Sequence, residues 1–168
     1  MVSSSQRKRG LVVFQVAGQI GALPIELVGE IIPMATLAHP PCLPSIVAGF
    51  LNLEGASIPV LRLDRLFGLP EQLPGVYTPL VVLRGFDPAL ALLVDKVDEI
   101  IHVPEEALAP VQQGEVFNGC VEAEIAYDQR VIHLLSLERL LLEQERQRLA
   151  EFQAMAQQRL DELEEAQP

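Results

Sequence analysis

The sequence has 168 residues and a formal net charge of −11, and 49% of its residues are hydrophobic. Only 5% are aromatic and tryptophan is absent, so the core has to be aliphatic. This length and hydrophobicity exclude general disorder and predict one domain, or two closely joined subdomains. The acidic balance disfavours partners that are themselves negatively charged, and we therefore expect no nucleic-acid binding and no attraction to anionic membranes.

The sequence also indicates a compartment. Residues 1–9 are polar and basic, and no signal-peptide pattern follows them. Residues 11–33 are apolar overall, but polar residues and a proline interrupt them, which excludes a spanning helix. The two cysteines are Cys42 and Cys120. We expect a cytoplasmic protein with reduced thiols and no direct membrane insertion, and a disulfide between the two cysteines is the weaker interpretation.

The first half of the chain predicts short strands joined by turns. Residues 1–9 are expected to form a disordered tail. Strands are predicted at 11–16 and 20–23, with a turn at 17–19, and at 30–32 after a short helical stretch at 24–28. The loop at 33–45 contains four prolines and cannot be regular. A second hairpin joins 46–53 to 57–61, where Pro59 predicts an edge strand or a bulge. Asp64 is expected to cap a short helix at 65–67.

The second half continues in the same style. Strands are predicted at 79–84 and 89–94 around a turn at 85–88, at 100–103, and at 121–126 and 130–135 around a turn at 127–129. Many short strands at close spacing predict an all-β barrel or sandwich rather than a parallel sheet with crossover helices. Several apolar runs are continuous rather than alternating, which indicates strands that are buried on both faces.

From Ser136 onward the hydrophobic spacing is that of a helix, with Ser136 as its N-cap and Leu137, Leu140 and Leu141 facing the body. An apolar stripe continues to the end of the chain through Leu149, Phe152, Ala156, Leu160 and Leu163. Two interpretations remain equally open. The segment is either a solvated, partly frayed helix, or a partner helix that buries Leu149, Phe152, Leu160 and Leu163 in a coiled coil or a groove.

The sequence contains no catalytic or metal-binding pattern. His39 and Cys42 are near one another, but a zinc site needs two more ligands and a thiol nucleophile needs a base and an orienting acid. His102 and His133 each stand alone beside apolar residues. The acidic residues at 95–99 lack the glycine and the bidentate glutamate of a calcium loop. Glycine-rich phosphate loops are absent. We therefore expect no cofactor, no metal and no enzymatic activity.

Five segments of the chain together resemble the CheW-like chemotaxis coupling-protein family. The clearest, residues 49–63, is similar to the family run G-[VI]-[IV]-N-L-R-G-x-[IV]-x-P-[VI]-[VI]-D-L. Residues 28–31 resemble its V-x-E-I, residues 41–49 its P-x-x-P-x-x-V-x-G, residues 92–97 its G-L-x-V-D-x-V, and residues 134–141 its closing L-L-D-L-x-x-L-L. The five segments occur in the family's order.

The resemblance implies a fold, a function and a set of contacts. The fold would be two small five-stranded barrel subdomains over residues 10–142, followed by a helical extension at 143–168. The protein would couple a chemoreceptor tip, or another sensor, to the regulatory domain of a CheA-type histidine kinase, which has the same fold. Binding would use strand edges and the groove between subdomains. The protein-binding residues implied by the motifs are Glu30, Val47, Gly49, Asn52, Glu54, Gly55 and Arg62.

Two residues depart from the family pattern. Glu54 stands where the family has arginine, and Arg62 stands where it has aspartate. Either the two residues contact one another or share a polar network, so that the swap preserves attraction, or Glu54 repels what the family's arginine attracts and the choice of partner is changed. The long helical extension is a further departure.

Three functions are therefore compared. The first is a coupling adaptor. The second is a scaffold or regulator of the same fold that no longer bridges receptor and kinase and self-associates, or binds another partner, through its C-terminal helix. The third, well behind, is an enzyme or ligand-binding barrel that uses Cys42, His39 or a central pocket.

Overall fold

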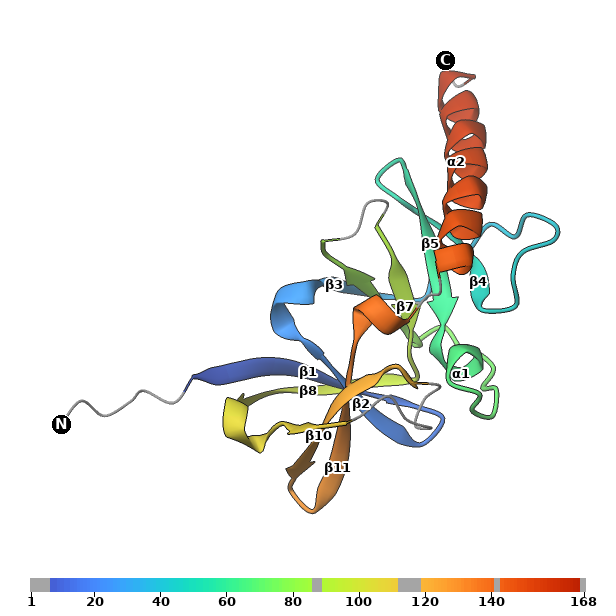
Figure 1. Cartoon of the computed structure of the whole chain (residues 1–168). Helices are drawn as coiled ribbons and strands as arrows, with labels where there is room; N and C mark the ends of the chain where they lie inside the picture. The colour runs from blue at the N-terminus through green and yellow to red at the C-terminus, as the bar shows by residue number, and fades with distance from the viewer. Residues whose placement is uncertain (1–6, 86–88, 112–118, 141–142, 167–168) are drawn as a thin grey trace.

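Two β-sheets and one long C-terminal helix make up the part of the chain that this computed structural model describes, which is residues 7–85, 89–111, 119–140 and 143–166 (Figure 1). The elements in chain order are β1 (Lys8–Val16), β2 (Gln19–Pro24), β3 (Val28–Pro33), β4 (Val47–Leu53), β5 (Ala56–Arg62), α1 (Leu63–Leu66), β6 (Pro79–Leu83), β7 (Ala91–Leu93), β8 (Lys96–Pro104), β9 (Ala109–Pro110), β10 (Val121–Tyr127), β11 (Arg130–Leu135) and α2 (Glu143–Glu165). Single turns of 3-10 helix cover Ile25–Leu27, Glu105–Ala107 and Leu137–Arg139. The predicted mostly-β architecture with one C-terminal helix is confirmed.

The first sheet has six strands in the order β8-β1-β2-β11-β10-β9. Both of its predicted hairpins form: β1 pairs with β2 around a turn at 17–18, and β10 pairs with β11 around a turn at 128–129. A parallel ladder between β11 and β2 then joins the beginning of the domain to its end. Since β1 starts at Lys8, the sheet includes two residues that the sequence assigns to a disordered tail. Residues 1–6 lie outside the described residues.

The second sheet has five strands in the order β3-β6-β7-β5-β4. The predicted hairpin of β4 and β5 forms, and β6 pairs with β7. The expectation that Pro59 marks an edge strand or a bulge holds only locally: β5 lies between β4 and β7, but β7 does not reach Pro59, and the β4–β5 register shifts just beyond it, between Val47 and Gly49. Proline is tolerated there because the ladder to β7 begins only at Val60, so no strand on that side needs an N–H from residue 59.

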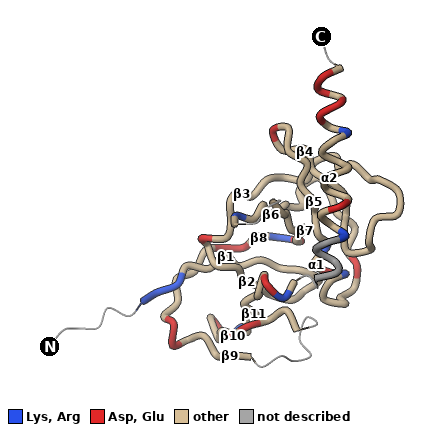
Figure 2. The backbone as a smooth tube through the Cα atoms, turned by 45° about the horizontal axis from the view of Figure 1, so that its top comes forward, with Lys and Arg blue, Asp and Glu red and all other residues tan. Residues whose placement is uncertain are grey.

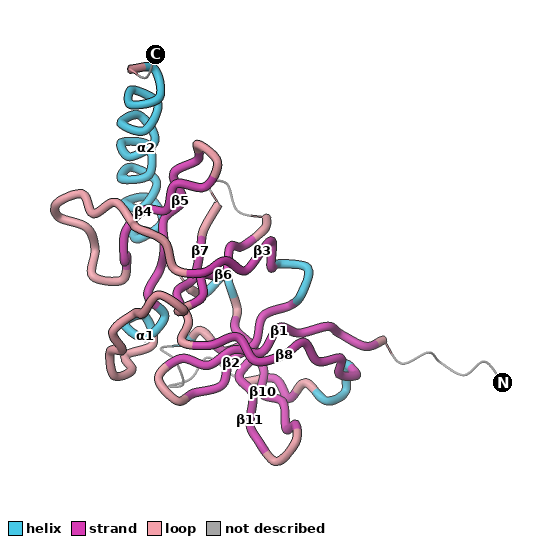
Figure 3. The backbone as a smooth tube through the Cα atoms, turned by 180° about the vertical axis from the view of Figure 1, so that it is seen from behind, coloured by secondary structure: helices cyan, strands magenta, loops and turns pink. Residues whose placement is uncertain are grey.

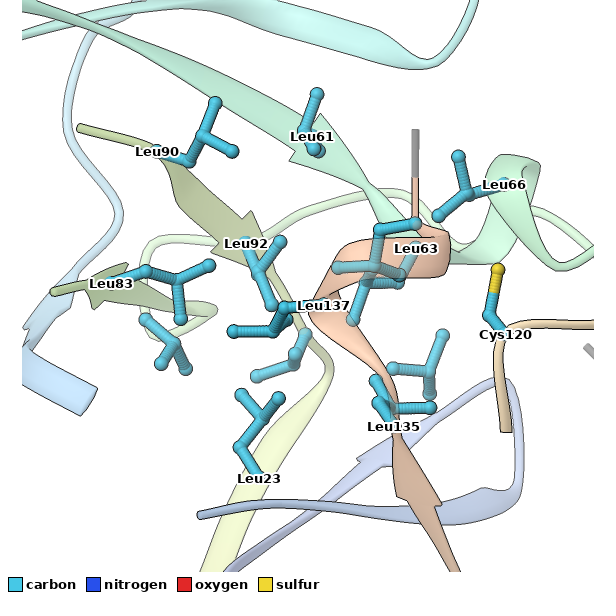
Figure 4. Packing of buried hydrophobic residues seen from close by; sticks show 14 of the residues in the cluster. Leu23, Leu61, Leu63, Leu66, Leu83, Leu90, Leu92, Cys120, Leu135 and Leu137 are labelled. Carbon is cyan, nitrogen blue, oxygen red and sulfur yellow. The ribbon is translucent and has the colours of Figure 1, made fainter. Parts of the chain in front are cut away.

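One hydrophobic cluster joins the two sheets (Figure 4). Leu23 and Leu135 enter it from the first sheet, and Leu61, Leu83 and Leu92 enter it from the second. A smaller cluster lies on each sheet separately. The two sheets therefore share one core rather than forming two independent domains.

The expectation of continuously buried strands holds for some strands and fails for others. In β1, residues 11–14 are all buried, and in β5 residues 57–61 are all buried. In β8, by contrast, Ile101 and Val103 are buried while Ile100 and His102 are exposed. β8 alternates because it lies at the end of the first sheet and turns one face outward.

The C-terminal helix begins later than its hydrophobic spacing predicts. Ser136 makes no side-chain cap and precedes only one 3-10 turn, after which α2 starts at Glu143. Leu137 and Leu140 are buried as predicted, and Leu141 lies outside the described residues. Seen from behind in Figure 3, α2 runs alongside β5. None of the described helices is both long and apolar enough to cross a bilayer.

Candidate protein-binding surface

The turn between β4 and β5 is exposed and held in a fixed shape. The Gly55 N–H donates to Asn52 Oδ1 at 3.1 Å, so Asn52 closes its own turn. Glu54 and Gly55 both have positive φ angles, of 52° and 87°. Gly55 suits this conformation because it has no Cβ, whereas Glu54 adopts it at a cost. The turn therefore presents the Glu54 side chain to solvent from a rigid backbone.

Val47 and Gly49, two further residues implied by the motifs, lie inside the protein. Val47 is buried in the cluster that joins the two sheets. A Cβ on Gly49 would lie 2.8 Å from the carbonyl oxygen of Ala38 and 2.9 Å from Cβ of Leu37. Ala38 and Phe50 form a β-bridge at this point. Gly49 thus lets the proline-rich loop, residues 33–45, pack against β4, and its contribution to a binding surface is indirect.

Glu30 lies exposed on β3, which forms one end of the second sheet. It pairs with Val82 of β6. The side-chain carboxylates of Glu30 and Glu54 form no hydrogen bond or ion pair with any other residue that the structure describes. Both carboxylates are therefore available to a partner's cation.

Arg62 belongs to a different part of the molecule from Glu54. Its guanidinium donates from Nε and Nη2 to the two oxygens of Asp64, at 3.1 and 2.8 Å, and from Nη2 to the Gln72 carbonyl oxygen at 2.8 Å. The interpretation in which Glu54 and Arg62 contact one another is therefore wrong. The physical reason is the hairpin register: Leu53 pairs with Ala56 at the turn and Val47 pairs with Leu61 at the open end, so the two side chains stand at opposite ends of β5.

Asp64 is the centre of this polar network. Its carboxylate also accepts the backbone N–H groups of Arg65 and Gln72, at 2.8 and 3.2 Å. Burial by itself raises the pKa of Asp64, but these hydrogen bonds and the one from Arg62 outweigh burial and hold that pKa below its usual value. The hydrogen bond to Asp64 likewise raises the pKa of Arg62. Asp64 is not the N-cap that the sequence predicts, because α1 already begins at Leu63.

Three exposed isoleucines form surface that the sequence analysis did not single out. Ile25, Ile31 and Ile100 are 38%, 45% and 54% exposed. Ile25 Cγ2 and the His102 ring both lie close to Gly10, at 2.9 and 3.5 Å from the position of a Cβ there. Ile25 therefore lies on the outer side of β1 near the end of β8, whereas Ile31 belongs to β3 of the other sheet. The signal that could have found Ile100 is the period-two alternation of β8, which the run of two isoleucines conceals.

The predicted partner-helix residues of α2 lie in different surroundings. Leu149 is buried in the cluster that joins the sheets, and Phe152 is half-buried. Leu160 and Leu163 line a groove of about 370 Å³ between α2, the β4–β5 hairpin and the proline-rich loop. Leu163 is 65% exposed. The base of the helix is thus anchored in its own chain, whereas its far end is largely solvated.

The residues considered for chemistry do not come together. Cys42 is exposed and Cys120 is buried, and both are free thiols. Within the described ranges, no group of three or more histidine, cysteine, aspartate or glutamate residues is placed to hold a metal ion. His133 lies opposite Glu124 on the neighbouring strand, with Nδ1 3.5 Å from Oε1.

Comparison with known proteins matches residues 10–145 to the family model described as a CheW-like domain. A probable chemotaxis protein CheW of Rhizobium etli is 28% identical over 145 residues, which cover 85% of this chain and 94% of that relative. The chemotaxis protein CheW of Treponema pallidum is 27% identical over 154 residues, covering 83% of this chain and 86% of that protein. The crystal structure of the scaffolding protein TtCheW from Thermoanaerobacter tengcongensis superposes with a TM-score of 0.75 at 24% identity, covering 84% of this chain and 93% of that one, and this similarity concerns the fold alone.

Proposed function

Because the chain belongs to the CheW-like domain family, we propose that it is a non-enzymatic adaptor that couples a chemoreceptor, or another sensor, to a CheA-type histidine kinase. The observation that carries this proposal is the match of residues 10–145 to the family, together with relatives that are named chemotaxis protein CheW or probable chemotaxis protein CheW. The coupling is expected to take place in the cytoplasm, and each sheet is expected to curl into a small barrel.

The surface chemistry supports a protein partner. The formal net charge is −11, and Figure 2 shows basic residues at the start of β1 while acidic residues are spread over turns and the far end of α2. A nucleic acid would be repelled by most of this surface. The exposed side chains Ile25, Ile31 and Ile100 are available for apolar contacts on the two sheets, and the fixed β4–β5 turn supplies a charged side chain that sets specificity.

A second function stays a candidate because of one residue. Glu54 occupies the position of the family's arginine and has no compensating cation among the described residues. A chain with this charge inverted could serve as a scaffold or regulator of the same fold that no longer bridges receptor and kinase. Self-association through α2 would suit such a protein, since Met155 and Leu163 are exposed on that helix.

Replacing Glu54 by arginine tests the role of this turn. The exchange restores the family's charge without touching the core, and we expect affinity for a receptor tip to rise by about tenfold, the size of effect that a single well-placed charge produces at an interface. The measurement is isothermal titration of the intact chain with the receptor tip and with the kinase regulatory domain.

Asp128→Arg is the matched control. Asp128 is also an exposed acid at positive φ (49°, against 52° for Glu54) in a hairpin turn, but it lies on the other sheet. The control is expected to leave both affinities within about twofold of the original, which is the ordinary scatter of an energetically neutral contact. Equal effects of the two substitutions would show that only net charge matters. If the unaltered chain binds neither partner, the adaptor function is refuted.

A further inference from the structure

Two glutamines of α2 hydrogen-bond to the backbone of β5. Gln157 Oε1 accepts the Ser57 N–H at 2.8 Å, and Gln157 Nε2 donates to the Gly55 carbonyl oxygen at 2.9 Å. Gln153 Nε2 donates to the Ser57 carbonyl oxygen at 3.2 Å. Residues four apart lie on one face of a helix, so both amides face the strand. They provide the donors and the acceptor that a neighbouring β-strand would otherwise provide.

This part of the β5 edge has no other strand beside it in the described structure. β7 pairs with β5 only from Val60 to Arg62, and β4 covers the opposite edge. Both the N–H and the carbonyl of Ser57 point toward α2. An open strand edge of this kind binds extended segments of other proteins through backbone hydrogen bonds. Without α2, residues 55–58 would present such an edge.

The helix also reaches one side of the β4–β5 turn, at Gly55, and leaves Asn52 and Glu54 exposed. The carboxylate of Glu164 lies 3.2 Å from the position of a Cβ on Gly55. The groove of about 370 Å³ beside it is lined by Asn52, Ser57, Leu160 and Leu163. α2 therefore lies beside the turn implicated in partner binding, but without filling the space between itself and the hairpin.

The outer part of α2 is weakly held. Its hydrogen bonds to the hairpin backbone are three, all between neutral groups and each of modest net strength, and its apolar side chains Phe152 and Leu160 are only half-buried. Its last turn contains no basic residue and ends in glutamates, and this charge opposes the helix dipole. Leu149, by contrast, anchors the base of the helix in the core. The base of α2 is therefore held more firmly than residues 153–165.

We propose that α2 is a built-in competitor that covers the β5 edge, next to the β4–β5 turn, against an extended segment of a partner protein. This inference rests on the proposed adaptor function, and it goes beyond the family because all but the first three residues of α2 lie outside the matched range 10–145. The β5 edge is covered while the helix lies on the strand. The partner binds to this edge once the helix has left the strand. The apparent affinity is then reduced by the fraction of molecules whose edge is uncovered.

The full-length double variant Gln153→Ala and Gln157→Ala removes all three hydrogen bonds and keeps strong helix formers in α2. We expect its affinity for at least one of two probes, the kinase regulatory domain and the receptor tip, to rise by about tenfold. A rise of this size is expected if the β5 edge is uncovered in about one tenth of the unaltered molecules and in nearly all molecules of the variant. Gln158→Ala is the control, since Gln158 bonds only to Glu162 on the same helix. A double variant that binds both probes with unchanged or lower affinity overturns the competitor role.

Amide hydrogen exchange tests the same inference without a partner. In the unaltered chain the Ser57 amide is expected to exchange faster than that of Val13 in the core, and the double variant is expected to accelerate Ser57 while leaving Val13 unchanged. Equal protection of the Ser57 and Val13 amides, or a Ser57 amide indifferent to the double substitution, would mean that α2 is a fixed part of the fold. Failure of every chain to bind either probe would refute the adaptor function, and the exchange result would still decide the role of α2.

Discussion

Replacing Leu92 by alanine is expected to lower the free energy of unfolding by about 3–4 kcal/mol, through lost burial and the cavity left behind. Leu92 is fully buried at the centre of β7, between Leu61 of β5 and Val81 of β6. Its side chain belongs to the cluster that also contains Leu23 and Leu135 of the other sheet. Both sheets should therefore lose stability together, in one cooperative transition that urea unfolding followed by circular dichroism will show.

Leu73→Ala is the control for this experiment. It makes the same chemical change at a side chain that is 97% exposed, and it should shift stability by less than about 0.5 kcal/mol. Two separate unfolding transitions in the Leu92 variant, with only one of them displaced, would contradict a shared core.

Replacing Asp64 by asparagine is expected to lower the free energy of unfolding at pH 7 by about 2–3 kcal/mol, because hydrogen bonds to charged groups are lost and the Arg62 guanidinium keeps no buried counterion. Asparagine has almost the same size, so no cavity complicates the result. The side chains of Arg62 and Asp64 are only 11% and 8% exposed. The matched control is Glu71→Gln, which weakens the exposed pair with Arg65 and should cost at most about 1 kcal/mol.

The pH dependence of that difference follows from the pKa of Asp64. Its pKa is lower in the folded chain than in the unfolded one, so the carboxylate stabilises the fold above the unfolded value of about 4 and this contribution is lost as pH falls further. The gap in stability between the original chain and Asp64→Asn should be constant from pH 6 to pH 8 and should shrink below about pH 4. A gap that stays constant down to pH 2.5 would show that the network does not depend on this charge.

Local features of the fold are predictable from the sequence because their signals are local. The turn at 17–18 contains a glycine at φ 80°, and the turn at 128–129 contains two residues at positive φ. Each turn stands between two short apolar runs, and this pattern was enough to predict both hairpins. The parallel ladders of β11 with β2 and of β5 with β7 have no such signal, since they join segments that are far apart in the sequence.

The candidate site was predictable in part, and its failures have physical causes. The motif run 49–63 marks the β4–β5 turn, and asparagine is a residue type that bonds its own turn, as Asn52 does with the Gly55 N–H. The expected contact between Glu54 and Arg62 is wrong because it left the length of the strand out of consideration. Eight residues of extended chain separate the two positions by roughly 25 Å. The Gln153 and Gln157 contacts were missed because glutamines in a charged helix indicate solvation unless the strand edge beside them is known.

The most direct test of the adaptor function is a three-component capture experiment. The receptor tip is immobilised, the kinase regulatory domain is passed over it, and retention of the kinase domain is measured with and without this chain. If the chain is an adaptor, the kinase domain is retained only when the chain is present, in proportion to the amount of chain bound. The Gln153→Ala and Gln157→Ala double variant is expected to retain more of the kinase domain. Binding of one partner that excludes the other, or no retention at any concentration of the chain, would contradict the adaptor function.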